Sequence, residues 1–256
     1  MSRAVACPAS AHLPRAEETG DRSSADWGTL VHAWAESGKW PVDSLATRRR
    51  QAAIDGSRWS RETLWPKDGL HEVSYALHTK NRIAVRERFA TREERDAWCA
   101  SFDSGWLTGT ADYVGDLFGE PWIDDLKTGK GHPVDYAGHL EGRIRAHEGD
   151  SWDVWQARMY AVAECLWSKP TGVWVSHTWW ARYPADSEPV RIGPRRVDSA
   201  EILGLTLPLL EMARTRVEAS WDRVDARPGA EQCRWCRAAP NCPAMQTTED
   251  PWETRS

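Results

Sequence analysis

The sequence has no apolar run long enough to cross a membrane, and no internal repeat is evident. Its first residues, MSRAVACPAS, are too short and too weakly apolar for a secretory signal. These absences predict a cytoplasmic protein with no membrane association. In that compartment thiols stay reduced, so structural disulfides are not expected.

The sequence also has fewer basic than acidic residues: 33 Lys and Arg against 38 Asp and Glu, which gives a net charge of −5. This balance argues against a protein that coats nucleic acid electrostatically. It leaves room for a local basic strip beside an acidic metal site. The triphosphate-binding pattern G-x-x-x-x-G-K-S/T is absent as well. Any unwinding of DNA would therefore come from a partner protein.

What the chain does contain is an alternation of helical and strand-like segments over most of its 256 residues. The first predicted helix is capped by Asp26 and runs from Trp27 to near Gly38. Further helices are predicted at 43–55, 91–100, 151–167 and 198–224. Strands are predicted, with turns at Asn81 and Gly119, at 71–77, 82–90, 107–118, 121–129 and 172–183. This order predicts an α/β domain with a central mixed β-sheet flanked by helices.

Three parts of different character follow from this pattern. Residues 1–25 form an expected N-terminal arm, residues 26–225 the folded core, and residues 226–256 a cysteine-rich tail. A polar stretch at 130–150 is predicted to be a loop or lid. The 17 tryptophans are assigned mainly to packing, with one or two available to stack on bases.

The stretch IDDLKTG (123–129) places two acids and a lysine at the end of an apolar strand. Strand alternation puts Asp125 and Lys127 on one side and Asp124 on the other. The preceding strand offers Asp112, and two neighbouring carboxylates repel unless a cation lies between them. Mg²⁺ or Mn²⁺ suits such oxygen ligands, and the lysine could then orient an attacking water. A surface hairpin with weak ion pairs explains the D-x-K pattern equally well when it is taken alone.

Three further features accompany the acidic strand. His32 lies in a helical segment, GTLVHAWAE, where a packed core histidine is the simpler interpretation of a lone residue. Gly109 in GTAD permits close backbone approach. Gln156 and Tyr160 of QARMY share one helical face, as they would in any amphipathic helix.

The tail carries three cysteines at short spacing, Cys233, Cys236 and Cys242, in the segment CRWCRAAPNC. Thiolates at this spacing suit a metal centre, which would hold a segment with little apolar content of its own. Cys7 is the candidate fourth ligand, and zinc is one possible occupant. The remaining cysteines lie in helix-like segments and are expected to be small buried apolar residues: Cys99 and Cys165.

Taken in order along the chain, these motifs resemble the RecB-like branch of the PD-(D/E)XK nucleases. The order is a helical His, then GTAD, then DLKTG, which is close to that branch's D-Y-K-T-G, and then QARMY. The likeness spans residues 30 to 160 and continues to the C-terminus through the cysteines.

The resemblance implies a role for each motif residue. His32 and Asp112 would be metal ligands, and Asp125 the central metal carboxylate. Lys127 would be the catalytic lysine. The helix motif would contact DNA or support the site through Gln156 and Tyr160.

The RecB-like branch also carries a Glu on its first core strand. Glu72 in HEVSYAL is the candidate for this ligand, and Glu87 competes with it. Asp124 points away from the other acids and is expected to lie outside the metal shell.

The cysteine pattern resembles the iron–sulfur nucleases of the same clan, including the CRISPR-associated protein 4 family and the AddB nuclease domain. That likeness implies a structural 4Fe–4S cluster on Cys7, Cys233, Cys236 and Cys242, favoured over zinc.

Two functions are compatible with these motifs. The first is a Mg²⁺- or Mn²⁺-dependent DNA exonuclease, acting on single-stranded ends in recombination, repair or phage DNA processing. The second is a DNA-binding subunit, non-catalytic or end-trimming, of a CRISPR-adaptation or recombination complex. The presence of every expected site residue favours the first. A duplex-cutting restriction-type enzyme would share the acids and lysine but not QARMY or the cysteines.

Overall fold

A computed structural model of the chain describes residues 23–55, 64–103, 105–129, 152–181, 189–219 and 242. Most of the predicted N-terminal arm, the 130–150 loop and nearly all of the tail lie outside these ranges. Among the helices in the described ranges, none has the length and apolar character needed to cross a membrane.

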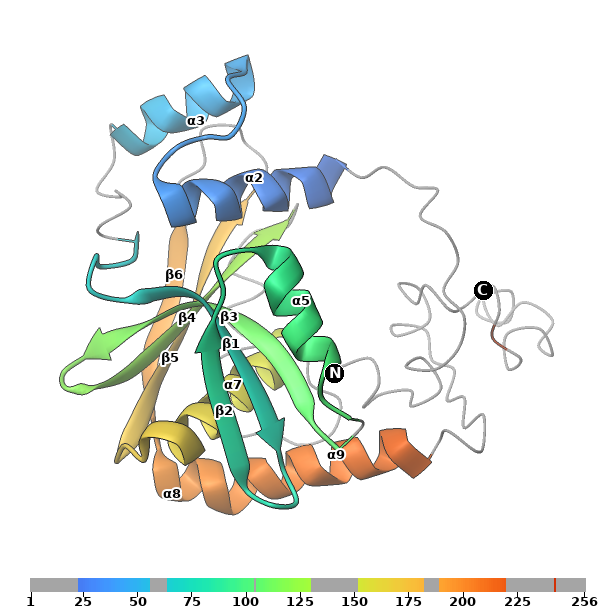
Figure 1. The fold of residues 1–256 in the computed structure, drawn as a ribbon. Coiled ribbons are helices and arrows are strands. Elements are labelled where there is room, and N and C mark those ends of the chain that lie inside the picture. Colours follow the sequence, from blue (N-terminus) through green and yellow to red (C-terminus); the bar gives the residue numbers. More distant parts are fainter. Residues whose placement is uncertain are drawn as a thin grey trace, which may run out of the picture.

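The core is a six-stranded sheet in the order β2-β1-β3-β4-β5-β6 (Figure 1). The strands are β1 (Leu70–His78), β2 (Ile83–Arg88), β3 (Leu107–Leu117), β4 (Glu120–Gly129), β5 (Gly172–Ala181) and β6 (Val190–Asp198). β4 and β5 pair in parallel, and every other neighbouring pair is antiparallel. The predicted mixed sheet is therefore confirmed, whereas β6 was not predicted.

The described helices lie largely where periodicity predicted them. They are α2 (Ser23–Ser37), α3 (Leu45–Asp55), α5 (Arg92–Ala100), α7 (Trp152–Ser168), α8 (Ser199–Glu201), the π-helix η2 (Ile202–Thr206) and α9 (Leu207–Ala219). The expected cap at Asp26 is wrong, because α2 begins at Ser23 and Asp26 lies inside it. Helix α5 begins with a capping box. The Thr91 hydroxyl accepts a hydrogen bond from the Glu94 N–H, and the Glu94 carboxylate accepts one from the Thr91 N–H.

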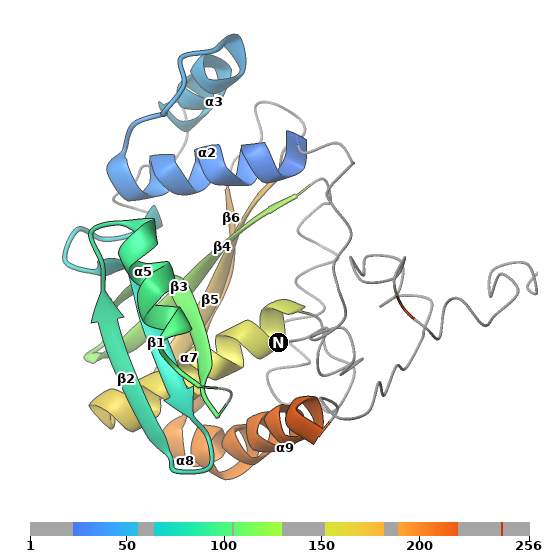
Figure 2. The ribbon, with the colours of Figure 1, turned by 45° about the vertical axis from the view of Figure 1, so that its right-hand side comes forward.

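Two apolar cores cover the two faces of the sheet. One packs α7, η2 and α9 against β1, β3 and β5. The other packs α2 and the segment around Trp65 against β4 and β5, through a tryptophan-rich cluster that includes Trp27, Trp34 and Trp180. In Figure 1, α2 crosses the upper end of the sheet and α9 the lower end. Figure 2, turned by 45°, keeps α2 and α9 at these opposite ends. The tryptophans named here are core residues, as predicted.

Side-chain alternation breaks on both β1 and β3 at the same level. Leu70 and Val73 of β1 pack on the α7 side although they are three residues apart, and Ala111 and Val114 of β3 do the same. A regular strand would place residues three apart on opposite faces. Glu72 lies inside this break and has a left-handed φ of 51°. The regular alternation is therefore interrupted where β1 carries Glu72 and β3 carries Asp112.

Candidate active site

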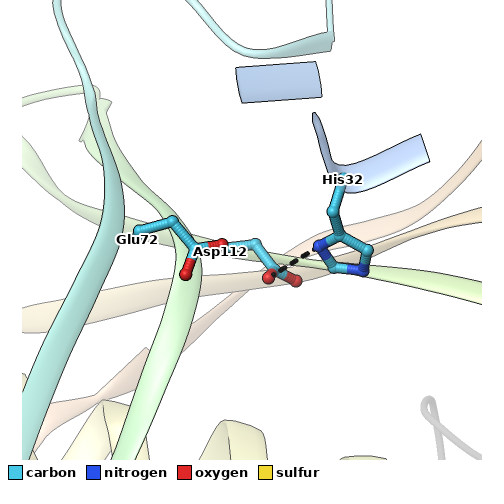
Figure 3. Close-up of side chains that lie close together, drawn as sticks. All are labelled: His32, Glu72 and Asp112. Atoms are coloured by element: carbon cyan, nitrogen blue, oxygen red, sulfur yellow. Dashed lines mark ion pairs between the residues drawn. The ribbon is translucent and has the colours of Figure 1, made fainter. Parts of the chain in front are cut away.

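The break in the sheet brings together three side chains from separate parts of the chain. His32 of α2, Glu72 of β1 and Asp112 of β3 each offer a ligand atom, and these atoms lie within 4.8 Å of one another. Figure 3 shows the three side chains converging, with His32 Nδ1 3.1 Å from Asp112 Oδ1. The His32 side chain is 34% exposed and that of Asp112 is 13% exposed, so the group is partly exposed to solvent.

Local structure explains how each of these residues arrives there. Trp27, Val31 and Trp34 form the buried stripe of α2, which leaves His32 at the edge of that stripe. Gly28 lets α2 approach the end of β4, because a Cβ there would lie 2.9 Å from Thr128 Oγ1. The backbone of Glu72, in its left-handed conformation, lies at the level of Asp112 in the β1–β3 pairing.

Asp112 also bridges to the acidic strand. The backbone pairing between β3 and β4 ends at Tyr113 and Asp124. Beyond it the Leu126 N–H donates to Asp112 Oδ2 at 2.7 Å, so a side-chain acceptor takes the place of a strand carbonyl. One Asp112 oxygen thus faces His32, and the other is held by β4.

The electrostatics of the cluster favour a bound cation. Burial raises the pKa of Glu72, and the neighbouring Asp112 charge raises it further, while Arg95 opposes the shift. Burial alone would also raise the pKa of Asp112, but His32, together with Lys127 and the Leu126 N–H, leaves that pKa lowered. Burial alone would lower the pKa of His32, but Asp112, together with the Asp125 and Glu72 charges, leaves it raised. A cation between the two acids relieves their repulsion.

The donor set fits a hard divalent ion. One imidazole nitrogen and carboxylate oxygens match the ligands that Mg²⁺ and Mn²⁺ accept, and the partly exposed position leaves room for water. Glu72, the candidate named from the sequence, lies in this cluster. Its competitor Glu87 is exposed on β2 and accepts a hydrogen bond from the Arg88 N–H.

The predicted alternation of the acidic strand is confirmed. Asp125 and Lys127 form an ion pair on one side of β4. Asp125 is not among the three residues within 4.8 Å, but its charge contributes to the raised pKa of His32. Lys127 in turn contributes to the lowered pKa of Asp112. The three-residue cluster and the Asp125–Lys127 pair therefore belong to one electrostatic site.

A hydrogen-bonded chain holds the lysine from the α7 side. Lys127 Nζ donates to Gln156 Oε1 at 3.0 Å, and Gln156 Nε2 donates to the Tyr160 hydroxyl at 2.7 Å. The Tyr160 hydroxyl donates to the Thr110 carbonyl at 2.5 Å. Burial, and then the Asp125 charge, raise the pKa of Tyr160 well above its usual range, so the hydroxyl stays protonated.

Asp124 lies on the opposite face, away from the cluster. It is fully buried and accepts hydrogen bonds from Trp65 Nε1 at 2.7 Å, Ser176 at 2.5 Å and Thr178 at 2.6 Å. Its role in this geometry is to satisfy buried donors, as expected for a residue that points away from the other acids.

Two residues of this neighbourhood were not predicted from the sequence. Arg95 Nη1 lies 2.7 Å from Glu72 Oε2 and ties α5 to the cluster. His177 is fully buried opposite Asp125 on β5, with Nε2 3.9 Å from Asp125 Oδ2. Burial, and then the charge of Lys127, lower the pKa of His177 to about 3, so it is neutral. His177 comes close to Asp125 because β4 and β5 pair in parallel. The sequence alone does not reveal that pairing, so it could not point to His177.

Of the four predicted cluster cysteines, only Cys242 lies in the described residues, and it is buried. Cys7, Cys233 and Cys236 lie outside them. Cys165 is buried in α7, as predicted, and Cys99 is half-buried in α5.

A family model described as the PD-(D/E)XK nuclease superfamily matches residues 2–243. Because this match covers most of the chain, the protein belongs to the PD-(D/E)XK nuclease superfamily. Membership implies a metal-dependent nuclease, in agreement with the acidic cluster on the sheet. The match is to the superfamily and does not distinguish its branches.

One solved structure, titled "Crystal structure of SSO0001", is 12% identical over 95% of this chain and 84% of that chain, with a TM-score of 0.36. Comparison with curated proteins gave no match.

Proposed function

We propose that the chain is a Mg²⁺- or Mn²⁺-dependent DNA exonuclease of the RecB-like branch, acting on single-stranded ends. The observation that carries this proposal is the convergence of His32, Glu72 and Asp112 within 4.8 Å, beside the Asp125–Lys127 pair. Recombination, repair or phage DNA processing is the setting proposed for this activity, with helicase or recombination proteins as partners.

In this proposal His32, Glu72, Asp112 and Asp125 hold the cation. A divalent ion there supplies Lewis acidity toward the phosphodiester and neutralises developing negative charge. Lys127 stands beside Asp125 with its ammonium fixed by Gln156, so it can orient a water molecule without first being ordered. Tyr160 positions Gln156 and is itself fixed by the Thr110 carbonyl.

The test uses Asp125→Asn with Asp68→Asn, an exposed aspartate in the turn before β1, as its matched control. Single-stranded DNA labelled at either end is incubated with Mn²⁺. Asp125→Asn should lower the rate by on the order of 10²-fold or more, because several kcal/mol of charge stabilisation depend on this site. Asp68→Asn should retain the wild-type rate.

Circular single-stranded DNA separates an exonuclease from an endonuclease, since a circle has no end. The proposal expects linear strands to be shortened and circles to survive. Cutting of circles would contradict the exonuclease assignment. Full activity of Asp125→Asn would contradict the site itself, and an inactive wild-type protein that binds DNA would favour the binding-subunit alternative.

We further propose that Cys7, Cys233, Cys236 and Cys242 hold a 4Fe–4S cluster with a structural role. The support is the spacing of the three tail cysteines and the likeness to iron–sulfur nucleases. Protein purified without oxygen should be brown and absorb broadly near ~400 nm. Zn²⁺ is d¹⁰ and therefore colourless. A colourless protein that contains zinc would contradict the iron–sulfur cluster and indicate a zinc site instead.

A further inference from the structure

A cavity of about 530 Å³ opens between α2 and the start of α5, beside the three-residue cluster of His32, Glu72 and Asp112. His32 and Glu72 line it, so it is continuous with the three-residue cluster. The α5 side contributes Arg92 and Arg95, and Phe89 adds an aromatic ring. A cavity of this size matches the range of small-ligand sites, roughly 300–1,000 Å³.

The cavity has walls of opposite charge. Glu36 makes the α2 side acidic, and Arg92 and Arg95 make the α5 side basic, where Glu72 is paired with Arg95. Arg92 is 78% exposed and lies 3.5 Å from Asp96 on the same helix, so its guanidinium can turn toward a ligand at little cost. Arg95 is held at 2.7 Å by Glu72. A negatively charged group entering the cavity is therefore directed to the α5 wall.

The arginine side chains provide this preference. Thr91 and Glu94 form a capping box that already occupies the Glu94 and Thr91 N–H groups. A phosphate would consequently be recognised by charge-assisted hydrogen bonds from guanidinium groups, which match phosphate oxygens in pairs.

We propose that this cavity seats one nucleotide of the DNA strand, with its phosphate on Arg92 and Arg95 and its base beside Phe89. The inference rests on the proposed nuclease function and adds a binding site to it. A base stacks on an aromatic ring whatever its identity, so the seat is not sequence-specific. His32 and Glu72 belong both to the cavity and to the three-residue cluster. The phosphodiester next to the seated nucleotide would therefore lie at that cluster.

The test measures binding rather than cleavage, in full-length protein that carries Asp125→Asn. A fluorescein-labelled single-stranded oligonucleotide is titrated with protein, and anisotropy gives the Kd at several salt concentrations. Arg92→Gln should weaken binding about 10-fold, the loss expected for a hydrogen bond to a charged group. It should also reduce the slope of log K against log salt by about 0.7, the value for one phosphate contact on a single strand.

The matched control is Arg82→Gln, an exposed arginine in the β1–β2 turn that does not line the cavity. It should leave both the Kd and the salt slope unchanged. Arg95 is left intact because its substitution would also disturb Glu72. A second measurement uses thymidine monophosphate, which should displace the oligonucleotide from the protein with Arg92 but about 10-fold less well from Arg92→Gln.

The outcomes separate this inference from the nuclease proposal. If Arg92→Gln binds DNA and thymidine monophosphate as Arg82→Gln does, the seat is overturned even when the wild-type protein cuts DNA. If the Arg92 effect appears in a protein that never cuts DNA, the seat is supported and the catalytic proposal fails alone.

Discussion

Asp124 and Asp125 are neighbours in the sequence, yet they meet opposite environments. Asp125 faces α7 and pairs with Lys127, while Asp124 points into the tryptophan-rich core and accepts three hydrogen bonds. Burial raises the pKa of Asp124, and Arg191, with Nη2 3.7 Å away, acts against that rise. Asp125 thus lies at the candidate site, while Asp124 lies inside the core and satisfies its donors.

Asp124→Ala should destabilise the fold by roughly 3 kcal/mol, because it removes the acceptor of three buried donors. Urea unfolding followed by circular dichroism measures this loss. Mn²⁺ affinity should stay within a few-fold of wild type, since the side chain faces away from the cluster. A large loss of Mn²⁺ affinity in a stably folded variant would place Asp124 among the ligands instead.

At this scale the sequence predicted what depends on strand alternation, on helical spacing and on the order of the motifs. The opposite orientations of Asp124 and Asp125 follow from the period of two, and the structure has them. Glu72 reaches the cluster because the alternation of β1 is interrupted at this residue. No residue pattern predicts that interruption, so the sequence could not decide between Glu72 and Glu87. Arg95 was missed because its contact joins a helix to a strand 23 residues away along the chain.

The element that supports the lysine is α7. It lies in the connection between the parallel strands β4 and β5, and it carries both Gln156 and Tyr160 on one face. Buried Glu164 fixes it to β1 and β2 by accepting from the Tyr75 hydroxyl at 2.5 Å and from Arg86 at 3.0 Å. Gly109 allows the close approach of α7 to β3, because a Cβ there would lie 3.1 Å from Tyr160 Cε1 and 2.6 Å from Met159 Cε.

Gly109→Ala should therefore displace Tyr160 and, through Gln156, the ammonium of Lys127. We expect the rate of DNA cleavage to fall at least 10-fold, since misplacement by about 1 Å can cost up to 10²-fold. The control is Gly204→Ala in η2, where a Cβ would meet no atom within 4 Å. A wild-type rate for Gly109→Ala would show that the Lys127–Gln156–Tyr160 chain does not set the rate.

The strands and helices of the core were predictable from periodicity and turns, with two exceptions. β6 (VRIGPRRVD) was missed because a glycine, a proline and three arginines obscure its alternation. The segment after it was predicted as one helix, but it contains the π-helical turn η2, which a period of 3.6 residues does not reveal.

The whole molecule brings its proposed cation ligands from α2, β1, β3 and β4, so a bound ion would link elements far apart in the chain. Mn²⁺ at about 100 times its Kd should add about 2.7 kcal/mol to the free energy of unfolding. For a chain of this size that corresponds to a rise in the melting temperature of roughly 5–10 °C. Scanning calorimetry of wild type and Asp112→Asn tests it, and only the wild type should respond. An equal response in both would locate the stabilising ion elsewhere.

Glu72 adopts its left-handed backbone without being glycine or asparagine, a conformation that costs on the order of 1 kcal/mol. Replacement by Asn, which tolerates this conformation, should leave the metal-free melting temperature equal or higher and remove most of the Mn²⁺-dependent rise. Selection for a higher melting temperature alone would therefore favour replacing glutamate at this position, and the variants obtained would lose nuclease activity. Libraries built on this scaffold should hold position 72 constant.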